Sequence, residues 1–468
     1  MGNAEKNCKW HFSLFSGGRE EGPNDAMGQN FSVKPYASLV RESIQNSLDV
    51  PIDDTQPVIV SFSCGKIDSR NYSNFFELIE HIKGCSDYFS KNRKAVAKYD
   101  AMLSFFNNMA ACASMSYIKI SDSNTKGMPY KKDDTGCPFY AFVRAAGISV
   151  KDDGATGGTY GFGKAAYYQL SPINTILVST RTQDDACYFE GASALCTHTY
   201  KEKKVVSVGF YDNNNGEPIS NIDDIPARFQ RNEPGTDFYI LGFNESEYMT
   251  TAWKEMQEEV LRSFWLAIFR EKLVVKIRMS QDKTITIDKS SLPSIMEHVF
   301  NDSNDNSVQN RALNPRPYYE AVSLTGTSPQ YVCYEDTLPH LGKVMLYIKK
   351  DSDATDKIIY MRKPLMLVYG KRTGNSFGYY GVFVCSNQKG DLLLSELENP
   401  KHNQWNKTNY KDPVTLRPKE DGAIALEEVD EFCKACADKL YDTEKKTSLD
   451  IIGLEDYLYV PDSLIEDE

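Results

Sequence analysis

The sequence predicts an α+β protein built from more than one domain. Short runs rich in Val, Ile, Tyr and Phe predict enough strands for about one sheet. Between them lie several segments whose apolar residues recur with a helical period. The chain has 468 residues, a length typical of roughly two to four domains. Its 28 Tyr and 23 Phe residues supply enough apolar surface for packed cores, which excludes wholesale disorder.

The charge balance argues against a broad nucleic-acid-binding face. The chain carries 53 Lys and Arg against 65 Asp and Glu, a formal net charge of −12. Nucleic acid could therefore bind only through a local basic groove. The 11 cysteines are odd in number and irregularly spaced, which favours a reduced protein over a disulfide framework. Because no apolar run is long enough to cross a membrane and no signal-peptide core is seen, we expect a soluble, cytoplasmic protein.

The first part of the chain is predicted to consist of an extended N-terminal arm at 1–35 and a domain at 36–300. A helix at 36–49 opens this domain, and Pro51 ends it because proline cannot continue the helical hydrogen bonds. A helical insertion is expected at 73–115. The other predicted elements are strands at 58–62, 117–120, 174–180, 187–195, 204–210 and 236–241, a helix through Ala165, Ala166 and Leu170, and a long helix at 249–271.

A polar segment at 300–317, rich in Asn, Asp and Pro, is predicted to be a linker. The second domain is expected at 318–468. Its predicted elements are strands near 343–349, 364–369 and 380–385 and a helix near 425–441.

The helix at 36–49 carries an unusual polar face. Its apolar stripe, which can rest on a sheet, consists of Val40, Ile44 and Leu48. Glu42, Asn46 and Asp49 stand at i, i+4 and i+7, so they share the opposite face. Such a face is compatible with an ordinary solvated helix, but three short polar side chains without Lys or Arg are less usual there.

A second motif is a loop that follows the strand at 117–120. It begins with Asp122, and Asn124 and Gly127 can adopt positive φ, so the sequence predicts a sharp turn with a carboxylate at its start. By itself this motif is compatible with a simple turn.

The third motif is a glycine-rich segment at 154–164, which has five glycines in ten residues and opens a helix. Backbone N–H groups without Cβ atoms can approach phosphate oxygens closely, and the helix start adds further donors. The spacing matches neither the Walker pattern nor a dinucleotide fingerprint, and a flexible structural loop is the alternative. A fourth motif, Gly235-Thr236, stands at the start of the strand at 236–241.

Taken in order, these four motifs resemble the GHKL (Bergerat-fold) ATPase family. That family includes type II topoisomerase ATPase subunits, Hsp90 chaperones, MutL repair proteins, MORC proteins and histidine kinases. The resemblance covers about residues 36–241 and implies an α/β sandwich that holds ATP and Mg²⁺ between helices, a movable lid and a mixed sheet. The acidic residue Glu42 is similar to the one found at this position in the members of the family that hydrolyse ATP, which we call the hydrolysing branch. Histidine kinases generally have Asn at this position.

The resemblance also implies individual roles. Glu42 is similar to the general base that activates water, Asn46 to the Mg²⁺ ligand, and Asp49 to a supporting acidic position. Asp122 is similar to the carboxylate that accepts a hydrogen bond from the adenine amino group, with Thr236 assisting through water. The residues that match the family's lid over the triphosphate are Gly157, Gly158, Gly161, Gly163 and Lys164.

The adenine loop departs from the family pattern. One extra residue separates Asp122 from Met128, and Asn124 stands near the position of the first glycine; Gly127 follows it. Asn tolerates left-handed φ better than most residues, so the turn is expected to persist.

In the hydrolysing branch a second domain, the transducer, usually contributes a lysine to the γ-phosphate, and the resemblance implies that 318–468 contains such an α/β domain, similar to ribosomal S5 domain 2. The candidates here are Lys363 and Lys371, either of which could equally be a surface lysine at a strand end. The arm at 1–35 is similar to arms that exchange across a dimer, so the resemblance implies an ATP-dependent homodimer with further, unidentified protein partners. Such ATPases often belong to prokaryotic multi-gene systems, including antiviral ones. The alternative function is an ATP-sensing module that recruits a partner without hydrolysis.

Two weaker signals are interpreted as structural. Cys433 and Cys436 form a lone CxxC in a helical pattern, and zinc needs four ligands, so buried helix cysteines are favoured. His402 to Trp405 is interpreted as a turn with a packed Trp405, with a partner-docking element as the alternative.

Overall fold

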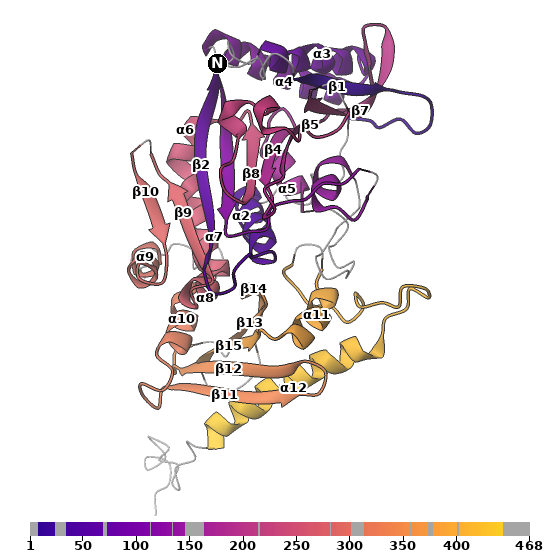
Figure 1. The fold of residues 1–468 in the computed structure, drawn as a ribbon. Coiled ribbons are helices and arrows are strands. Elements are labelled where there is room, and N and C mark those ends of the chain that lie inside the picture. Colours follow the sequence, from indigo (N-terminus) through magenta and orange to yellow (C-terminus); the bar gives the residue numbers. More distant parts are fainter. Residues whose placement is uncertain are drawn as a thin grey trace, which may run out of the picture.

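The computed structural model confirms a mixed α+β protein and describes most of the chain. The described ranges are 8–23, 34–68, 73–112, 114–132, 134–145, 163–213, 216–280, 282–300, 313–354, 357–372, 378–399 and 402–442. Within these ranges the strands form two sheets, one of ten strands and one of five. Figure 1 shows the larger sheet above and the smaller one below it, with helices around both.

The ten-stranded sheet runs in the order β1-β7-β5-β4-β8-β3-β2-β9-β10, and β6 pairs with β7. Its pairs are antiparallel except for β2 and β9, which are parallel. The strands are β1 (Lys9–Leu14), β2 (Val58–Asp68), β3 (Ser114–Ser123), β4 (Thr175–Arg181), β5 (Cys187–Ala194), β6 (His198–Tyr200), β7 (Lys203–Asp212), β8 (Gly235–Leu241), β9 (Leu273–Arg278) and β10 (Thr284–Ile287).

Both faces of the central strands are buried. Successive side chains of a strand point to opposite faces, and in β8 Phe238 and Ile240 enter one apolar cluster whereas Tyr239 and Leu241 enter another. On the first face lie α2 (Pro35–Leu48) and α7 (Trp253–Ser263). The predicted insertion forms η2 (Ser73–Glu77), α3 (Leu78–Tyr88) and α4 (Arg93–Cys112), and it covers the second face.

Two expectations for this domain need correction. The helix predicted at 249–271 is not continuous, because the backbone leaves helical geometry at Phe264 (φ −125°). The sequence did not reveal this break, because the apolar residues on both sides of Phe264, which are fully buried, continue with a helical spacing. The elements there are α6 (Glu245–Glu247), the π-helical turn η6 (Tyr248–Ala252), α7 and α8 (Trp265–Phe269), followed by the unpredicted strands β9 and β10 and by α9 (Leu292–Val299).

The N-terminal arm includes a strand that the sequence did not reveal. Trp10 and Phe12 of β1 are buried, and β1 pairs with β7 of the same chain at the edge of the sheet. The remaining short elements of the first domain are the π-helical turn η3 (Tyr140–Arg144), α5 (Ala165–Gln169), η4 (Ile222–Asp224) and η5 (Ala227–Phe229).

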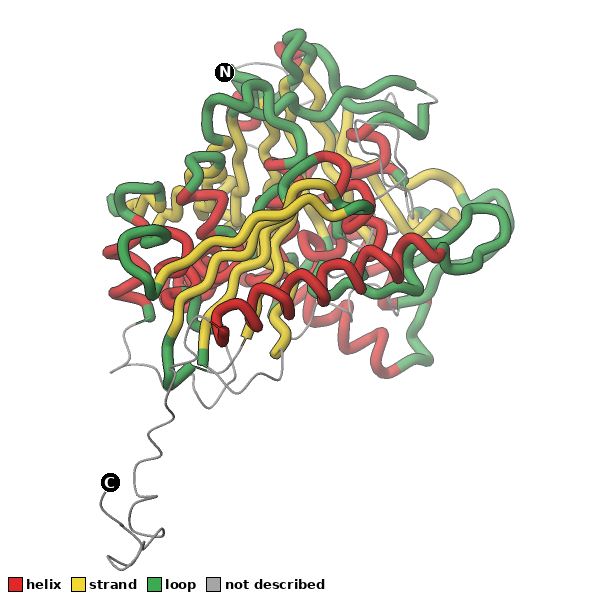
Figure 2. Tube along the Cα trace, turned by 90° about the horizontal axis from the view of Figure 1, so that it is seen from below, coloured by secondary structure: helices red, strands yellow, loops and turns green. Residues whose placement is uncertain are grey.

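The five-stranded sheet runs in the order β11-β12-β15-β13-β14, with β13 and β15 parallel. Its strands are β11 (Tyr331–Leu338), β12 (Gly342–Lys350), β13 (Lys357–Arg362), β14 (Met366–Arg372) and β15 (Tyr379–Cys385), of which β11 and β13 were not predicted. α11 (Gln388–Leu397) and α12 (Glu420–Asp442) pack on one face, and Figure 2 shows α12 lying along these strands. α10 (Arg316–Ser323), which begins inside the predicted linker, packs on the other face.

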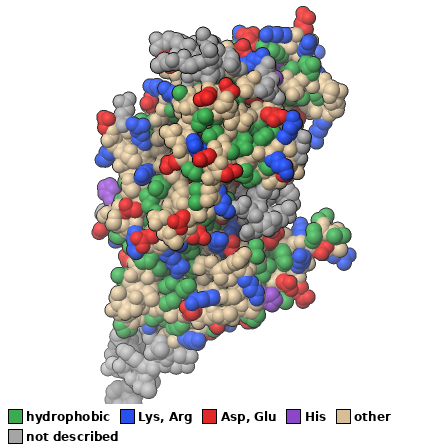
Figure 3. Space-filling model, viewed as in Figure 1, with side chains coloured by type: hydrophobic (Ala, Val, Ile, Leu, Met, Phe, Trp, Pro, Cys, Tyr) green, Lys and Arg blue, Asp and Glu red, His purple; other side chains and the backbone are tan. Residues whose placement is uncertain are grey.

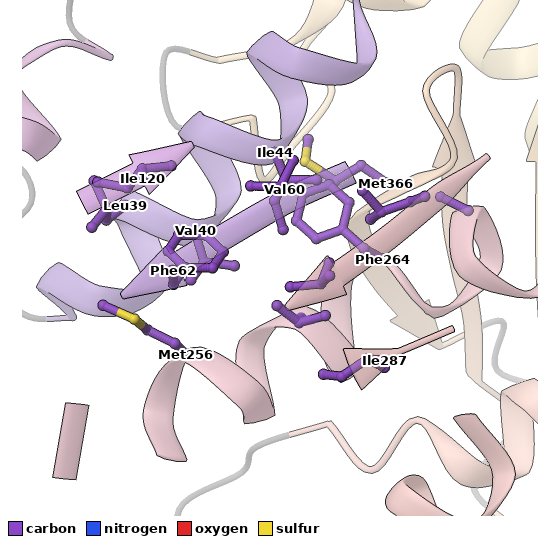
Figure 4. Packing of buried hydrophobic residues seen from close by; sticks show 14 of the residues in the cluster. Leu39, Val40, Ile44, Val60, Phe62, Ile120, Met256, Phe264, Ile287 and Met366 are labelled. Carbon is purple, nitrogen blue, oxygen red and sulfur yellow. The ribbon is translucent and has the colours of Figure 1, made fainter. Parts of the chain in front are cut away.

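The two sheets share one apolar cluster where they meet. Met366 at the start of β14 lies beside Phe264, Ile44 and Val60 of the first domain, as Figure 4 shows. The β13–β14 hairpin is therefore packed directly against α2 and its neighbours.

On the face drawn in Figure 3, Lys and Arg side chains are interspersed with Asp and Glu, as the charge balance predicts. Among the described helices, none has a stretch long and apolar enough to cross a lipid bilayer.

Candidate functional site

Asp122 is a buried carboxylate near the end of β3, with 7% of its surface exposed. It accepts three hydrogen bonds through its side chain, two of them from distant parts of the chain. Ser47 of α2 donates its hydroxyl to Oδ2 at 2.9 Å. Oδ1 accepts the hydroxyl of Thr125 at 2.6 Å and the backbone N–H of Thr236 at 2.7 Å. α2, β3 and β8 thus meet at this one side chain.

The electrostatics of Asp122 reflect this environment. Burial raises its pKa above the usual value for Asp, because the charged form loses water. The donors from Thr125, Thr236 and Ser47 and the charge of Arg231 oppose that shift by stabilising the carboxylate. The surrounding donors therefore fix the orientation of the Asp122 carboxylate, which acts as a hydrogen-bond acceptor.

The loop after Asp122 turns as expected. Asn124 adopts a left-handed φ of +60° and Gly127 a φ of +69°. A methyl group added at Gly127 would overlap the carbonyl oxygen of Arg181, so the backbone can pass β4 only without a Cβ. The N–H of Met128 then donates to the hydroxyl of Thr180 at 2.9 Å, which fixes the loop to the end of β4.

The side chain of Asn124 forms hydrogen bonds with the loop that follows α2. Its Nδ2 donates to the carbonyl oxygens of Asp53 and Gln56, each at 3.0 Å, and its Oδ1 accepts the N–H of Asp53. The contacts of Asn124 are thus intramolecular, and its contribution to the candidate site is to shape the turn.

β8 brings a second loop onto Asp122. Gly235 has a φ of +133°, and a Cβ there would lie 2.5 Å from the carbonyl oxygen of Asp122. Buried Arg231 donates to the same oxygen at 2.7 Å. The hydroxyls of Thr236 and Thr180 lie 3.1 Å apart. Sequence reasoning assigned no role to Arg231 or Thr180, because neither belongs to a local pattern.

The predicted polar face of α2 is present and open. Glu42 is half-buried, whereas Asn46 and Asp49 are exposed. Asn46 donates its Nδ2 to Oε1 of Glu42 at 3.1 Å, so the Asn46 atom that could bind a cation is its carbonyl oxygen. The stripe of Val40, Ile44 and Leu48 is buried, as predicted.

The end of the glycine-rich segment lies against Glu42. A methyl group added at Gly163 would overlap the Glu42 carboxylate, so glycine is required for this approach. Lys164 donates instead to the carbonyl oxygen of Ala145, and burial lowers the pKa of its ammonium group. Three other predicted residues, Gly157, Gly158 and Gly161, lie outside the described residues.

Tyr167 of α5 connects the two halves of the candidate site. Burial, and then the negative charges of Glu42 and Asp122, raise the pKa of Tyr167 well above its usual value. Tyr167 is fully buried, and its helix α5 packs against α2 on this side of the sheet. The central expectation from the sequence was that residues 42 and 122 converge, and the fold places them on the same side of the sheet.

The structure separates the two candidate lysines. Lys363 is exposed in the turn between β13 and β14. The preceding Arg362 is buried, and against the effect of burial the carboxylates of Glu398, Asp391 and, least, Asp49 raise its pKa. Lys371, near the end of β14, pairs with Asp430 of α12 at 2.8 Å. The two lysines thus lie at opposite ends of β14, and Lys371 is held by α12.

The structural interpretations of the weaker motifs agree with the fold. Cys433 and Cys436 are buried in α12, and Trp405 is buried with its indole N–H directed at Glu398. In the described part of the chain no three His, Cys, Asp or Glu side chains are grouped to hold a metal ion. A divalent cation beside α2 would therefore depend on Asn46 together with oxygens of a ligand.

Comparison with protein-family models gives no match for this chain, and comparison with curated proteins gives no similar sequence.

Proposed function

We propose that this protein is a Mg²⁺-dependent ATPase of GHKL type that works as a nucleotide-driven conformational switch. The observation that carries the proposal is that two carboxylates of different character lie on the same side of the sheet, Glu42 on α2 and Asp122 bonded to Ser47 of that helix. Asp122 is buried and fixed by three donors, whereas Glu42 lies on the accessible face of α2.

The environment of Asp122 suits recognition of an adenine amino group. A carboxylate offers about four acceptor positions, and among the described residues Oδ1 takes two donors and Oδ2 takes one. The remaining position on Oδ2 is matched to an N–H donor such as the exocyclic amine of adenine. The Thr180 and Thr236 hydroxyls lie beside it and can hold a bridging water.

The polar face of α2 is suited to bind the triphosphate group of ATP. Asn46 would hold a Mg²⁺ ion through its carbonyl oxygen, a ligand type that Mg²⁺ prefers. When bound, the ion neutralises charge on the phosphates. Glu42, one helical turn away, orients a water molecule toward the γ-phosphorus and accepts its proton as the bond to ADP breaks. Lys363 supplies a positive charge to the γ-phosphate from the second domain.

Two variants test this proposal. We expect the purified protein to hydrolyse ATP, and Glu42→Ala to bind ATP with unchanged affinity but to lose turnover. The control is Glu258→Ala, which removes a carboxylate from α7 that pairs with Arg262 of the same helix. Turnover at the wild-type rate in Glu42→Ala, after removal of contaminating ATPases, would refute the assignment of the base.

A second candidate function is an ATP-sensing module that recruits a partner without hydrolysis. The observation in its favour is that Oε1 of Glu42 already accepts the Asn46 amide and that Gly163 covers the carboxylate. A base held in this way would have to be released before it could act on water. ATP-dependent dimerisation, measured by light scattering, with no phosphate release would select this function.

A further inference from the structure

We propose that Arg41 is a positioning residue that couples the polar face of α2 to Lys363 in the second domain. This inference rests on the proposed function, because it assigns the means by which Lys363 is held at the same site. It follows from a chain of hydrogen bonds that leads from α2 to the β13–β14 hairpin.

The first link is the guanidinium of Arg41 itself, whose side chain is only 18% exposed. Its Nη2 donates to the carbonyl oxygen of Leu367 in β14 at 3.0 Å and to that of His402 at 2.7 Å. Its Nη1 donates to the hydroxyl of Ser263 in α7 at 2.8 Å. One planar side chain on α2 therefore holds two separate segments of the second domain.

The second link is a buried ion network beneath the hairpin turn. Glu398 accepts Arg362 in a bidentate pair, at 2.6 and 2.8 Å, and also accepts Nδ1 of His402 at 2.5 Å. Burial alone would raise the pKa of Glu398, but the charge of Arg362 and the bond from His402 lower it to about 2. Glu398 is thus ionised at neutral pH, and its two parallel bonds with Arg362 fix the geometry of the pair.

The third link is from this network to Lys363. Arg362 donates through Nη1 to the carbonyl oxygen of Lys363 and to Asp391 at 2.8 Å. Leu365, the last residue of the turn, has a φ of +72°, which is strained for a branched side chain and is retained because its surroundings fix it. The backbone of the turn is therefore set by Arg362, and the Lys363 side chain is left exposed.

The position of the hairpin along α2 brings the turn to the catalytic face. Arg41 bonds to Leu367, and Ile44, about one turn further along α2, lies beside Met366, so the hairpin runs along α2 from Arg41 toward the C-terminal end of the helix. At about 100° per residue, the order around the helix is Arg41, Asp49, Glu42 and Asn46. The face that carries Glu42 and Asn46 thus adjoins the side on which the hairpin packs, and the proposal has the flexible side chain of Lys363 extend from the turn toward that face.

The test uses the full chain and the reactivity of Lys363. Acetic anhydride labelling with mass spectrometry would follow Lys363 and Lys371 in the presence of Mg²⁺ and a non-hydrolysable ATP analogue. In the wild type we expect the analogue to slow labelling of Lys363 by about tenfold and to leave Lys371 unchanged. Arg41→Gln should lose this protection and raise the Kd for the analogue by no more than about tenfold, and Arg41→Lys should restore only part of the protection because it cannot reach two carbonyls at once.

The matched control is Arg262→Gln. Arg262 is buried to the same degree as Arg41, with 17% of its side chain exposed, but its ion pair is with Glu258 of its own helix. We expect this variant to protect Lys363 as the wild type does. In ATP hydrolysis, Arg41→Gln should lower kcat by about tenfold and raise KM by no more than about tenfold, and adding Lys363→Ala to it should cause no greater loss than Lys363→Ala alone.

The outcomes separate the two proposals. A wild type that does not bind the analogue would remove the proposed function and this inference with it. Binding without protection of Lys363, equal loss in Arg262→Gln, or losses that multiply in the double variant would overturn only the positioning role. If Arg41→Gln does not fold, Arg41→Lys, which keeps the charge beside Glu259, carries the same comparison.

Discussion

Replacing Asp122 with Asn changes one acceptor atom of the candidate site into a donor. The structure fixes which atom it is. Thr125 and the Thr236 N–H both donate to Oδ1, so the amide oxygen of Asn must occupy that position. The new NH₂ group then takes the place of Oδ2, where the Ser47 hydroxyl can rotate to accept from it. The fold is therefore expected to survive, with a stability change of about 1 kcal/mol.

The effect on nucleotide binding should be larger. The adenine amine would lose a hydrogen bond to a charged acceptor, worth about 1.5–3 kcal/mol, and would face another donor. This corresponds to an increase of about 10- to 150-fold in the Kd for ATP. Inosine triphosphate carries an acceptor oxygen in place of that amine, so its relative affinity should rise by at least about tenfold.

Calorimetric titration of both nucleotides into the wild type, Asp122→Asn and Asp134→Asn measures this change. Asp134 is a control because its carboxylate lies in an exposed turn. Urea unfolding reports whether Asp122→Asn retains its stability. An Asp122→Asn protein that binds ATP as tightly as the wild type and keeps the same preference over inosine triphosphate would refute the adenine assignment.

Two other perturbations follow from the same contacts. Gly163→Ala should displace the Glu42 carboxylate and lower turnover by about a hundredfold with little change in ATP affinity. The control is Gly22→Ala, where no atom lies within 4 Å of the added methyl group, so neither turnover nor affinity should change. Equal turnover in the two variants would contradict the close approach of Gly163 to Glu42. Acid should destabilise the fold, because burial and the neighbouring His198 lower the pKa of His81 to about 3. The unfolded chain, in which His titrates near about 6.5, then binds a proton that the folded chain does not, so this contribution is complete above that pH and falls by about 2 kcal/mol at about pH 5. Urea unfolding at both pH values should show that loss in the wild type and less of it in His81→Phe, and an unchanged slope in the variant would assign it to other groups.

Much of the first domain could be predicted from local patterns. The helix at 36–49, the insertion at 73–115 and the strands around Asp122 and Thr236 follow from apolar periodicity and from the residues that end each element. The left-handed turn at Asn124 was predictable for the same reason, since it depends on the conformational preference of one residue.

Other features could not be predicted because they depend on partners far away in the chain. β1, β9 and β10 are short strands at or near the edges of the sheet, and their pairing is set by neighbours rather than by their own composition. The break at Phe264 could not be predicted, because apolar residues continue with a helical spacing on both sides of it. The residues at the break are buried, so no exposed polar residue indicates the end of the helix.

For the candidate site, the sequence by itself determined which side chains share the polar face of α2 and which carboxylate begins the loop after β3. Only the tertiary structure decided that Ser47 bonds to that carboxylate and Arg231 to the backbone oxygen of the same residue, that Lys164 bonds to Ala145, and that Lys371 is paired with Asp430 of α12. The physical reason is range. Helical and strand periods are fixed by neighbours a few residues apart, whereas a hydrogen bond across 75 or 109 residues exists only after the sheet has been assembled.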